Sequence, residues 1–490
     1  MPHDQLAPLF DSQVVEQSLG WRVFPVSEAE IATRLSENEF RDVVKTREGQ
    51  KIYFLKRMMP LGPEEARLLR GALENYRGRG KKGQGAIESF REFVKANNFS
   101  LGRPQKEGLE KAVTMLFSPE GPLAELLEHE CLEEIAVIGL GKSKPVHAFD
   151  AAFGWLPTNL YFASGQEVKN IANSLAGKSG RRVTFRTPAV NSFLRDGSRM
   201  NAVMEPAAVS GPCITIRKFR KEPFTPAELV ACGSASAEQM AFLWMALQAD
   251  CSALVCGNTG SGKTTLLNSL FNFIPKNERV VIVEETPEIS VPHRHAVKLA
   301  TSDGIGIGMQ ELIINTLRMR PDRVVIGEAR SRKEVAAFVD TMLAGQGKGC
   351  YATFHAQSSE DAIARLQGLG VMPQDIGAID LLLVQKRWTR FSSGIGSEER
   401  KLVEISEASA KKGAKGAAGM NRLFAYDFRK KKFFTAARPK RAMEKICRTF
   451  GIGEKAIEGE ISRRAKFILD LRGARQEEFF NAIGNYGKLE

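Results

Sequence analysis

Residues 257–264 have the types and spacing needed to bind the phosphates of a nucleotide. They read G-N-T-G-S-G-K-T, which fits G-x-x-x-x-G-K-[ST] between an apolar segment and a helical segment. Glycines let backbone N–H groups close around phosphates, the lysine reaches the β- and γ-phosphates, and the threonine hydroxyl binds Mg²⁺. We therefore expect ATP and Mg²⁺ as ligands, bound by Gly257, Asn258, Thr259, Gly260, Ser261, Gly262, Lys263, Thr264 and Thr265.

Carboxylates directly follow two other apolar segments. Residues 281–283 run into Glu284 and Glu285, and residues 324–326 are followed by Gly327 and Glu328. Ligands of parallel sheets bind at the carboxyl edge, where one carboxylate can deprotonate the attacking water and another can hold Mg²⁺. We expect all three glutamates to be catalytic, with Glu328 joining Thr264 at the metal; the alternative is a solvated acidic turn.

His355 follows a further apolar segment, residues 349–354. A neutral imidazole at a strand end can sense the γ-phosphate, because small shifts change its charge near pH 7. The alternative is a histidine that only hydrogen-bonds the end of its strand. We include His355 among the candidate catalytic residues.

The elements that must position these residues alternate between strand and helix. Short apolar segments at 253–256, 279–283, 323–326 and 349–354, with helices at 237–248 and 265–271, predict a parallel sheet. Residues 121–219 predict a small α/β domain with strands at 135–138, 182–185 and 213–219. Its helix should open with a capping box, Ser164 and Glu167, and Asp196-Gly197 should form a turn.

The chain is long enough for several domains, and we expect four regions. Near its end, strands are expected at 402–405 and 422–428, followed by helices that carry Ile457 and Ile468 on one face. Glycine-rich basic stretches at 77–85 and 411–419 should be loops or linkers. The expected regions are 1–117 with no assigned role, an α/β N-terminal domain at 118–225, a P-loop core at 226–400 and a basic strand-plus-helix tail at 401–490.

Composition narrows the function classes. The 490 residues are 43% hydrophobic and 26% charged, which is typical of a folded chain, and apolar runs such as 381–384 are too short to cross a bilayer. The net charge is +13, but 25 Lys and Arg against 13 Asp and Glu lie in residues 386–490. Few aromatic residues interleave with the cations at 411–415 and 429–432, so nucleic acid is not expected as a partner. The seven scattered cysteines are expected to be reduced core thiols in a cytoplasmic protein.

These four motifs, in this order, resemble those of the ATPases of type II/type IV secretion and pilus assembly. In that family they are called the Walker A motif, the Asp box, an atypical Walker B motif and the His box. The resemblance spans Glu133 to Trp388 and includes L-R-D-G-S-R-M-N-A-V at 194–203, I-R-K-F at 216–219 and L-R-M-R-P-D at 317–322. A tetracysteine zinc module is absent from the sequence, so it looks nearer to archaeal members.

The resemblance implies a RecA-like core and further site residues. Arg199 and Arg217 match the arginines that the family's N-terminal domain presents to the γ-phosphate. A glycine before Glu328 is ordinary in the family. Glu285 stands where the family usually has Asp, and between the two adjacent glutamates we favour Glu284 as the base.

The resemblance also implies a homo-hexameric motor that acts on a membrane platform protein at the inner face of the cell membrane. The basic C-terminal region is expected to be either a solvated surface or one that faces anionic lipid. Assembly, retraction, secretion and archaellum rotation are not separated by the sequence. Two alternatives are a nucleic-acid-dependent RecA-like ATPase and a nucleotide-binding scaffold without turnover.

Overall fold

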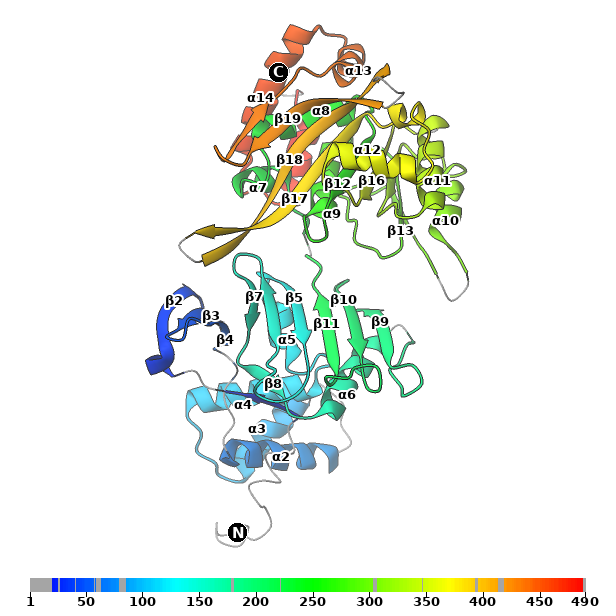
Figure 1. Ribbon diagram of the computed structural model, residues 1–490. Helices are drawn as coiled ribbons and strands as arrows, with labels where there is room; N and C mark the ends of the chain where they lie inside the picture. Colours follow the sequence, from blue (N-terminus) through cyan, green and yellow to red (C-terminus); the bar gives the residue numbers. More distant parts are fainter. Residues whose placement is uncertain are drawn as a thin grey trace. The chain divides into compact units, whose positions relative to one another are not determined.

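The computed structural model describes residues 20–24, 27–39, 41–56, 58, 63–78, 85–177, 180–220, 222–302, 306–345, 347–392, 395–412 and 418–487. The chain divides into two compact units, residues 1–220 and 221–490 (Figure 1). Each unit is described by itself below. In the described residues, none of the helices is both long and apolar enough to span a bilayer.

The first unit contains three sheets and five helices in its described residues. The sheets have the strand orders β1-β8, β2-β3-β4 and β7-β6-β5-β11-β10-β9. The strands are β1 (Trp21–Val23), β2 (Ile31–Glu37), β3 (Arg41–Thr46), β4 (Lys51–Leu55), β5 (Leu132–Val137), β6 (His147–Asp150), β7 (Gly154–Pro157), β8 (Leu160–Phe162), β9 (Ala189–Phe193), β10 (Arg199–Val203) and β11 (Cys213–Arg217). The helices are α2 (Pro63–Gly78), α3 (Ala86–Ala96), α4 (Arg103–Phe117), α5 (Leu123–Glu128) and α6 (Gly165–Ala176), after a short 3₁₀ turn, Glu28–Glu30.

One hydrophobic core joins the early and late parts of this unit. It includes Tyr53 of β4 and Phe90 of α3 together with Ile171 of α6 and Ile216 of β11. Residues before and after position 117 therefore pack into the same core. The expected division of the chain into four regions remains a proposal.

Two local predictions in the first unit are wrong. Residues 182–185 form no strand, because Asn173 Oδ1 accepts the Val183 N–H at 2.7 Å and the Thr184 hydroxyl hydrogen-bonds to the Thr187 hydroxyl. Helix α6 has Ser164 at its N-cap, but the serine side chain makes no capping hydrogen bond. The Gly20 carbonyl instead accepts the Ser164 N–H at 3.2 Å, so that donor is already satisfied.

The second unit is built on one sheet with the strand order β14-β13-β15-β16-β12-β17-β18-β19-β20. The strands are β12 (Ala253–Gly257), β13 (Val280–Glu284), β14 (Ala296–Ala300), β15 (Arg323–Ile326), β16 (Gly349–Phe354), β17 (Leu381–Ser392), β18 (Ile395–Lys412), β19 (Ala418–Asp427) and β20 (Lys432–Thr435). The helices are α7 (Pro226–Ala231), α8 (Ala237–Gln248), α9 (Lys263–Leu270), α10 (Met309–Thr316), α11 (Arg332–Leu343), α12 (Ser359–Gly368), α13 (Arg441–Phe450), α14 (Glu454–Asp470) and α15 (Gln476–Asn485), with 3₁₀ turns at Phe271–Phe273 and Asp375–Ala378.

Helices cover both faces of this sheet (Figure 1). Along β12, Ala253 and Val255 join the core beneath α8, α9 and α14, whereas Leu254 and Cys256 join the core beneath α10, α11 and α12. Strands buried on both faces read as continuous apolar segments, which is why β12, β13, β15 and β16 were recognisable in the sequence. In the spatial order given above, the neighbours from β14 through β13, β15, β16 and β12 to β17 pair in parallel. The neighbours from β17 through β18 and β19 to β20 pair antiparallel.

The C-terminal helices complete the core of the second unit. Helix α8 is buried along nearly its whole length, and Trp244 on it stacks on Phe273 at 5.4 Å. The Arg464 guanidinium of α14 lies 4.4 Å from the Trp244 ring centroid, a close cation–π contact. Residues after position 400 thus continue the sheet and cover its helices.

The predicted α/β fold class, with strands and then helices at the C-terminal end, is confirmed. Three cysteines, Cys251, Cys256 and Cys350, are buried as expected, whereas Cys232 is exposed. All seven are free thiols. The loop predictions at 77–85 and 411–419 fall largely on residues 79–84 and 413–417, which lie outside the described residues.

Candidate functional site

The phosphate-binding motif forms the expected loop between β12 and α9. Two of its glycines are required by geometry. A Cβ on Gly257 would lie 2.2 Å from the Gln385 carbonyl oxygen, and Gly260 has φ +71°, a left-handed conformation that favours glycine. Lys263 Nζ donates hydrogen bonds to the carbonyls of Gly257 (3.1 Å) and Asn258 (3.2 Å), so the ammonium group lies across the start of the loop.

The strand order brings the predicted carboxylates and histidine to the same edge as this loop. Strands β13, β15, β16 and β12 are consecutive parallel neighbours, so their carboxyl ends lie in a row. Glu284 ends β13, Glu328 follows β15 and His355 follows β16. The sequence therefore placed all three candidates correctly at the edge that holds the loop.

A charged cluster surrounds Glu328. Its Oε1 lies 2.6 Å from His355 Nε2, and its Oε2 lies 2.6 Å from Arg330 Nη2. Arg330 also reaches the second strand end, since its Nη1 lies 2.7 Å from Glu285 Oε2. Glu328 is largely covered at 20% exposure, whereas Glu285 is 62% exposed. A single arginine therefore bridges the two carboxylates, and Glu328 sits between it and the imidazole.

Glu284 has a different environment from Glu285. Its side chain is buried, and its Oε1 accepts the backbone N–H groups of Glu288 and Ile289, both at 2.8 Å. Burial raises the pKa of Glu284 to about 7, although these hydrogen bonds favour the ionised form. Chemistry at Glu284 must use its other oxygen, and its pKa suits a general base near neutral pH.

His355 is held at the end of β16 by an arginine. Arg365 Nη1 donates to the His355 carbonyl at 2.7 Å, and its guanidinium lies 5.2 Å from the Phe354 ring centroid. Burial lowers the pKa of His355, and repulsion from Lys263 lowers it further. The imidazole is therefore neutral at pH 7, close enough to Lys263 to feel its charge and in contact with Glu328.

In the first unit, Arg199 and Arg217 are direct cross-strand neighbours. They are paired residues of the antiparallel strands β10 and β11, and both are exposed on one face of the sheet. The Asp196-Gly197 turn forms as predicted: Asp196 accepts both the N–H and the hydroxyl of Ser198, and Ser198 Oγ accepts the Phe219 N–H at 3.0 Å. On its other side, Arg217 has Glu134 of β5 as its register partner.

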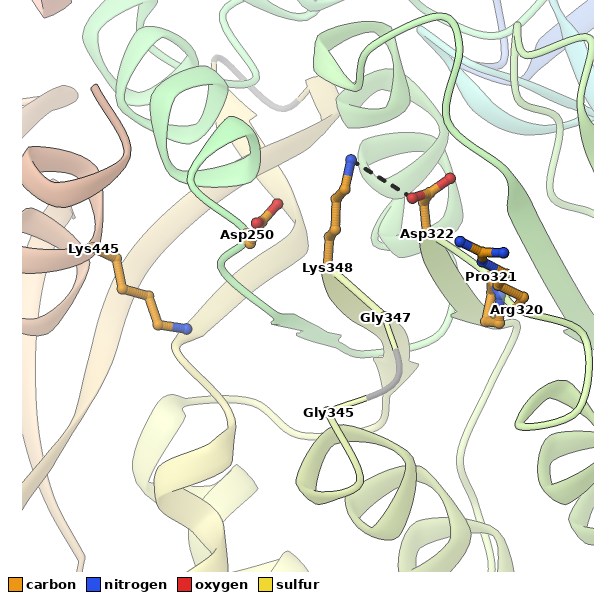
Figure 2. A pocket seen from close by; sticks show the side chains of 8 residues that line it. All are labelled: Asp250, Arg320, Pro321, Asp322, Gly345, Gly347, Lys348 and Lys445. Atoms are coloured by element: carbon orange, nitrogen blue, oxygen red, sulfur yellow. Dashed lines mark ion pairs between the residues drawn. The ribbon is translucent and has the colours of Figure 1, made fainter. Parts of the chain in front are cut away.

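An open pocket of about 670 Å³ lies at the opposite, amino edge of the large sheet. Figure 2 shows Lys348 and Asp322 pointing toward each other, with Nζ and Oδ1 3.6 Å apart, and Lys445 reaching in from α13 on the other side. None of the predicted site residues lines this pocket. The pocket is therefore separate from the phosphate-binding loop.

Sequence reasoning missed Arg330 and Arg387. Arg330 follows a strand-end glutamate by two residues, a spacing that could have drawn attention to it. Arg387 carries no such signal, because its closeness to the loop depends on β17 lying next to β12. Among the described residues, there is no group of three or more His, Cys, Asp or Glu side chains arranged to hold a metal ion by themselves.

Comparison with known proteins gives a family match over most of the chain. The model of the family described as "Type II/IV secretion system protein" matches residues 153–464. An uncharacterized protein of Methanocaldococcus jannaschii is 33% identical over 316 residues, which are 61% of this chain and 43% of that protein. A putative conjugal transfer protein of Mycobacterium tuberculosis is 34% identical over 234 residues, 46% of this chain and 66% of that protein.

The chain spans less than half the length, 43%, of each of two similar M. jannaschii proteins. The protein VirB11 of Agrobacterium fabrum is 27% identical over 300 residues, 53% of this chain and 84% of that protein. Among solved structures, the VirB11 ATPase of Brucella suis, in complex with sulphate, is 23% identical and covers 61% of this chain and 95% of its own, with a TM-score of 0.30. The ATPase DotB of Legionella pneumophila is 16% identical and covers 74% and 94%, with a TM-score of 0.40.

Proposed function

The chain belongs to the type II/IV secretion system protein family, and from that premise we propose that it is a Mg²⁺-dependent P-loop ATPase that drives secretion or pilus assembly. The observation that carries the proposal is the charged cluster of Glu328, His355 and Arg330 at the same sheet edge as Lys263. A similar protein of Mycobacterium tuberculosis is named as a conjugal transfer protein, which supports the same class of activity.

The donors at this edge fit a bound Mg²⁺. The Thr264 hydroxyl and the Glu328 carboxylate supply oxygen ligands, and Mg²⁺ is commonly held by one or two protein groups together with substrate phosphates and water. When bound, the ion would neutralise charge on the phosphates.

The side chains of this chain then divide the work of hydrolysis. Lys263 leaves the loop carbonyls to bind the β- and γ-phosphates, and the loop glycines donate backbone N–H groups. Glu284, with a pKa near 7, accepts a proton from the attacking water. Neutral His355 contacts Glu328 and couples the presence or absence of the γ-phosphate to the position of that carboxylate. Arg330 holds Glu328 and Glu285 in place.

The finer parts of the proposal come from the family resemblance. Arg199 and Arg217 would supply positive charge to the γ-phosphate in a homo-hexamer at the inner face of the membrane, where a platform protein receives the motion. The exposed, directly paired arginines on β10 and β11 support this role. A scaffold without turnover is disfavoured because Lys263, Thr264 and Glu328 are all present.

Steady-state phosphate release tests the proposal. The parent should hydrolyse ATP only with Mg²⁺, and Lys263→Ala should abolish hydrolysis because the phosphate contact and its charge compensation are lost together. Lys432→Ala, at an exposed position on β20, is the matched control and should keep the parental rate. Parental hydrolysis by Lys263→Ala would overturn the proposed function.

A further inference from the structure

Arg387 lies on the strand beside the phosphate-binding loop. Strand β17 lies beside β12 and pairs with it in parallel (Figure 1). Gln385 is the register partner of Gly257, so Arg387 is two residues further along the strand, level with the loop. The Arg387 backbone N–H donates to Asn258 Oδ1 at 3.4 Å. The backbone of Arg387 therefore lies directly beside the phosphate-binding loop.

The guanidinium of Arg387 lies over the middle of the loop. A Cβ placed on Gly260 would be only 2.6 Å from Arg387 Nη1, which means that the guanidinium contacts the backbone of this glycine. Any larger residue at position 260 would displace it. The charge therefore lies at the backbone that the motif uses to surround phosphates.

The other side of the same guanidinium is anchored on β18. Arg387 Nε lies 2.5 Å from Glu398 Oε2, and Thr389 Oγ1 donates to Glu398 Oε1 at 2.7 Å. A guanidinium has five N–H donors in a rigid fork, so one edge can bind a carboxylate while another meets a second anion. Glu398 positions Arg387 with Nη1 toward the loop.

We propose that Arg387 is a phosphate-binding residue, positioned by Glu398, that contacts the phosphate chain of the bound nucleotide from within the same unit as Lys263. This inference rests on the proposed function of the loop. The loop surrounds the α- and β-phosphates, so the contact is made with ADP and with ATP alike. In that respect Arg387 differs from Arg199 and Arg217, whose proposed partner is the γ-phosphate.

The chain offers a matched control on the same pair of strands. Arg390 of β17 binds Glu399 of β18 with Nη1 and Oε1 2.5 Å apart, so it repeats the pairing of Arg387 further along the hairpin. Replacing Arg390 with glutamine removes an equivalent ion pair. It leaves the arginine at the loop unchanged.

The experiment measures the affinity of the full chain for a fluorescent ADP analogue and, by competition, for inorganic pyrophosphate. Arg387→Gln should weaken both by about tenfold or more, as expected for loss of a charge-assisted contact. Arg387→Lys should fall between Arg387→Gln and the parent, because it keeps the charge but not the fork. Arg390→Gln should bind both ligands as the parent does. Thermal unfolding of each variant confirms that it is folded, and the lysine variant decides the result if Arg387→Gln does not fold.

The outcomes separate this inference from the proposed function. Parental affinity of Arg387→Gln, beside weakened binding by Lys263→Ala, would overturn the role of Arg387 and leave the loop as a nucleotide site. Weakened ADP binding with unchanged pyrophosphate binding would also overturn it, since Arg387 would then contact the nucleoside. Parental binding of both ligands by Lys263→Ala would instead contradict the proposed function itself.

Discussion

The two ends of the same four parallel strands, β12, β13, β15 and β16, carry two charged clusters of very different character. At the amino edge, Arg323 is 1% exposed and Glu278 is 5% exposed. At the carboxyl edge, Arg330 is 53% exposed and His355 is 34% exposed. Both clusters combine an arginine with two carboxylates, so residue type alone does not distinguish them.

The amino-edge cluster satisfies its charges internally. Arg323 donates to Glu278 Oε2 at 2.6 Å, to Asp250 Oδ1 at 2.9 Å and to the Tyr351 hydroxyl at 3.0 Å, and Lys348 adds a contact to Glu278 at 2.9 Å. This network joins the starts of β12, β13, β15 and β16. Its geometry is that of a structural anchor, since a buried arginine with several hydrogen bonds has little left to offer a ligand.

The carboxyl-edge cluster is open to further partners. Lys263 donates to two loop carbonyls, Glu285 is largely exposed, and Glu284 has a pKa near 7. Exposed charges and a carboxylate with a shifted pKa, close to a phosphate-binding loop, are typical of a reaction site. On this sheet, a structural cluster therefore differs from a reaction site in two ways: its charged side chains are buried, and their hydrogen bonds are made within the cluster.

The largest expected effect concerns the proposal that arginines of the first unit act together with the carboxyl-edge cluster in hydrolysis. Arg199→Ala and Arg217→Ala should each lower ATP turnover by about 10³–10⁵-fold, the range known for arginines that stabilise phosphoryl transfer. ADP affinity should stay near the parental value, because ADP has no γ-phosphate. Titration with ADP and steady-state hydrolysis on the same preparations measure both. Near-parental turnover in both variants would remove these arginines from the mechanism.

The next largest expected effect concerns the stability that the amino-edge cluster provides. Glu278→Gln should lower the free energy of unfolding by about 3–5 kcal/mol, because it leaves the buried Arg323 without its main counter-charge. Urea denaturation measures this change. Asp470→Asn, at an exposed position that ends α14, is the control and should change stability by less than about 0.5 kcal/mol. An equally small change for Glu278→Gln would mean that the amino edge is no anchor.

A smaller effect concerns pH. Burial raises the pKa of Glu284 from its usual 4.5 to about 7, so the base is ionised only above that pH. Turnover should therefore rise about tenfold from pH 6 to pH 8, following one ionisation. Between pH 4.5 and 7 the folded chain holds a proton that the unfolded chain has lost, so the contribution of Glu284 to stability falls as the pH rises across this window. A flat rate profile would exclude Glu284 as the base.

The sequence could predict the strand ends and the loop because both are local. Continuous apolar segments mark β12, β13, β15 and β16, and the residue after each is read directly from the chain. Lys263, Glu284, Glu328 and His355 follow from that reading. The catalytic roles assigned to them stay predictions.

The order of the strands in each sheet and the register between them could not be predicted from the sequence. Arg323 begins a strand between Asp322 and Val324, and nothing in the sequence predicts its burial. Glu278 and Asp250 approach it only because of the strand order β13-β15-β16-β12. Arg199 and Arg217 are neighbours because of the register between β10 and β11, which the sequence does not reveal. Arg387 reaches the loop only because β17 lies beside β12. Contacts between strands distant in the chain were therefore the part that required the structure.

The most direct test of the account compares Glu328→Gln with Glu278→Gln in one assay of Mg²⁺-ATP hydrolysis, at a temperature where both variants are folded. The account predicts that Glu328→Gln loses about 10²-fold or more of the parental rate while its unfolding midpoint is unchanged, as expected when a carboxylate of the reaction site is removed. It predicts that folded Glu278→Gln hydrolyses ATP at close to the parental rate. Parental hydrolysis by Glu328→Gln, or an equal loss in folded Glu278→Gln, would contradict the division of the sheet into a catalytic edge and a structural edge.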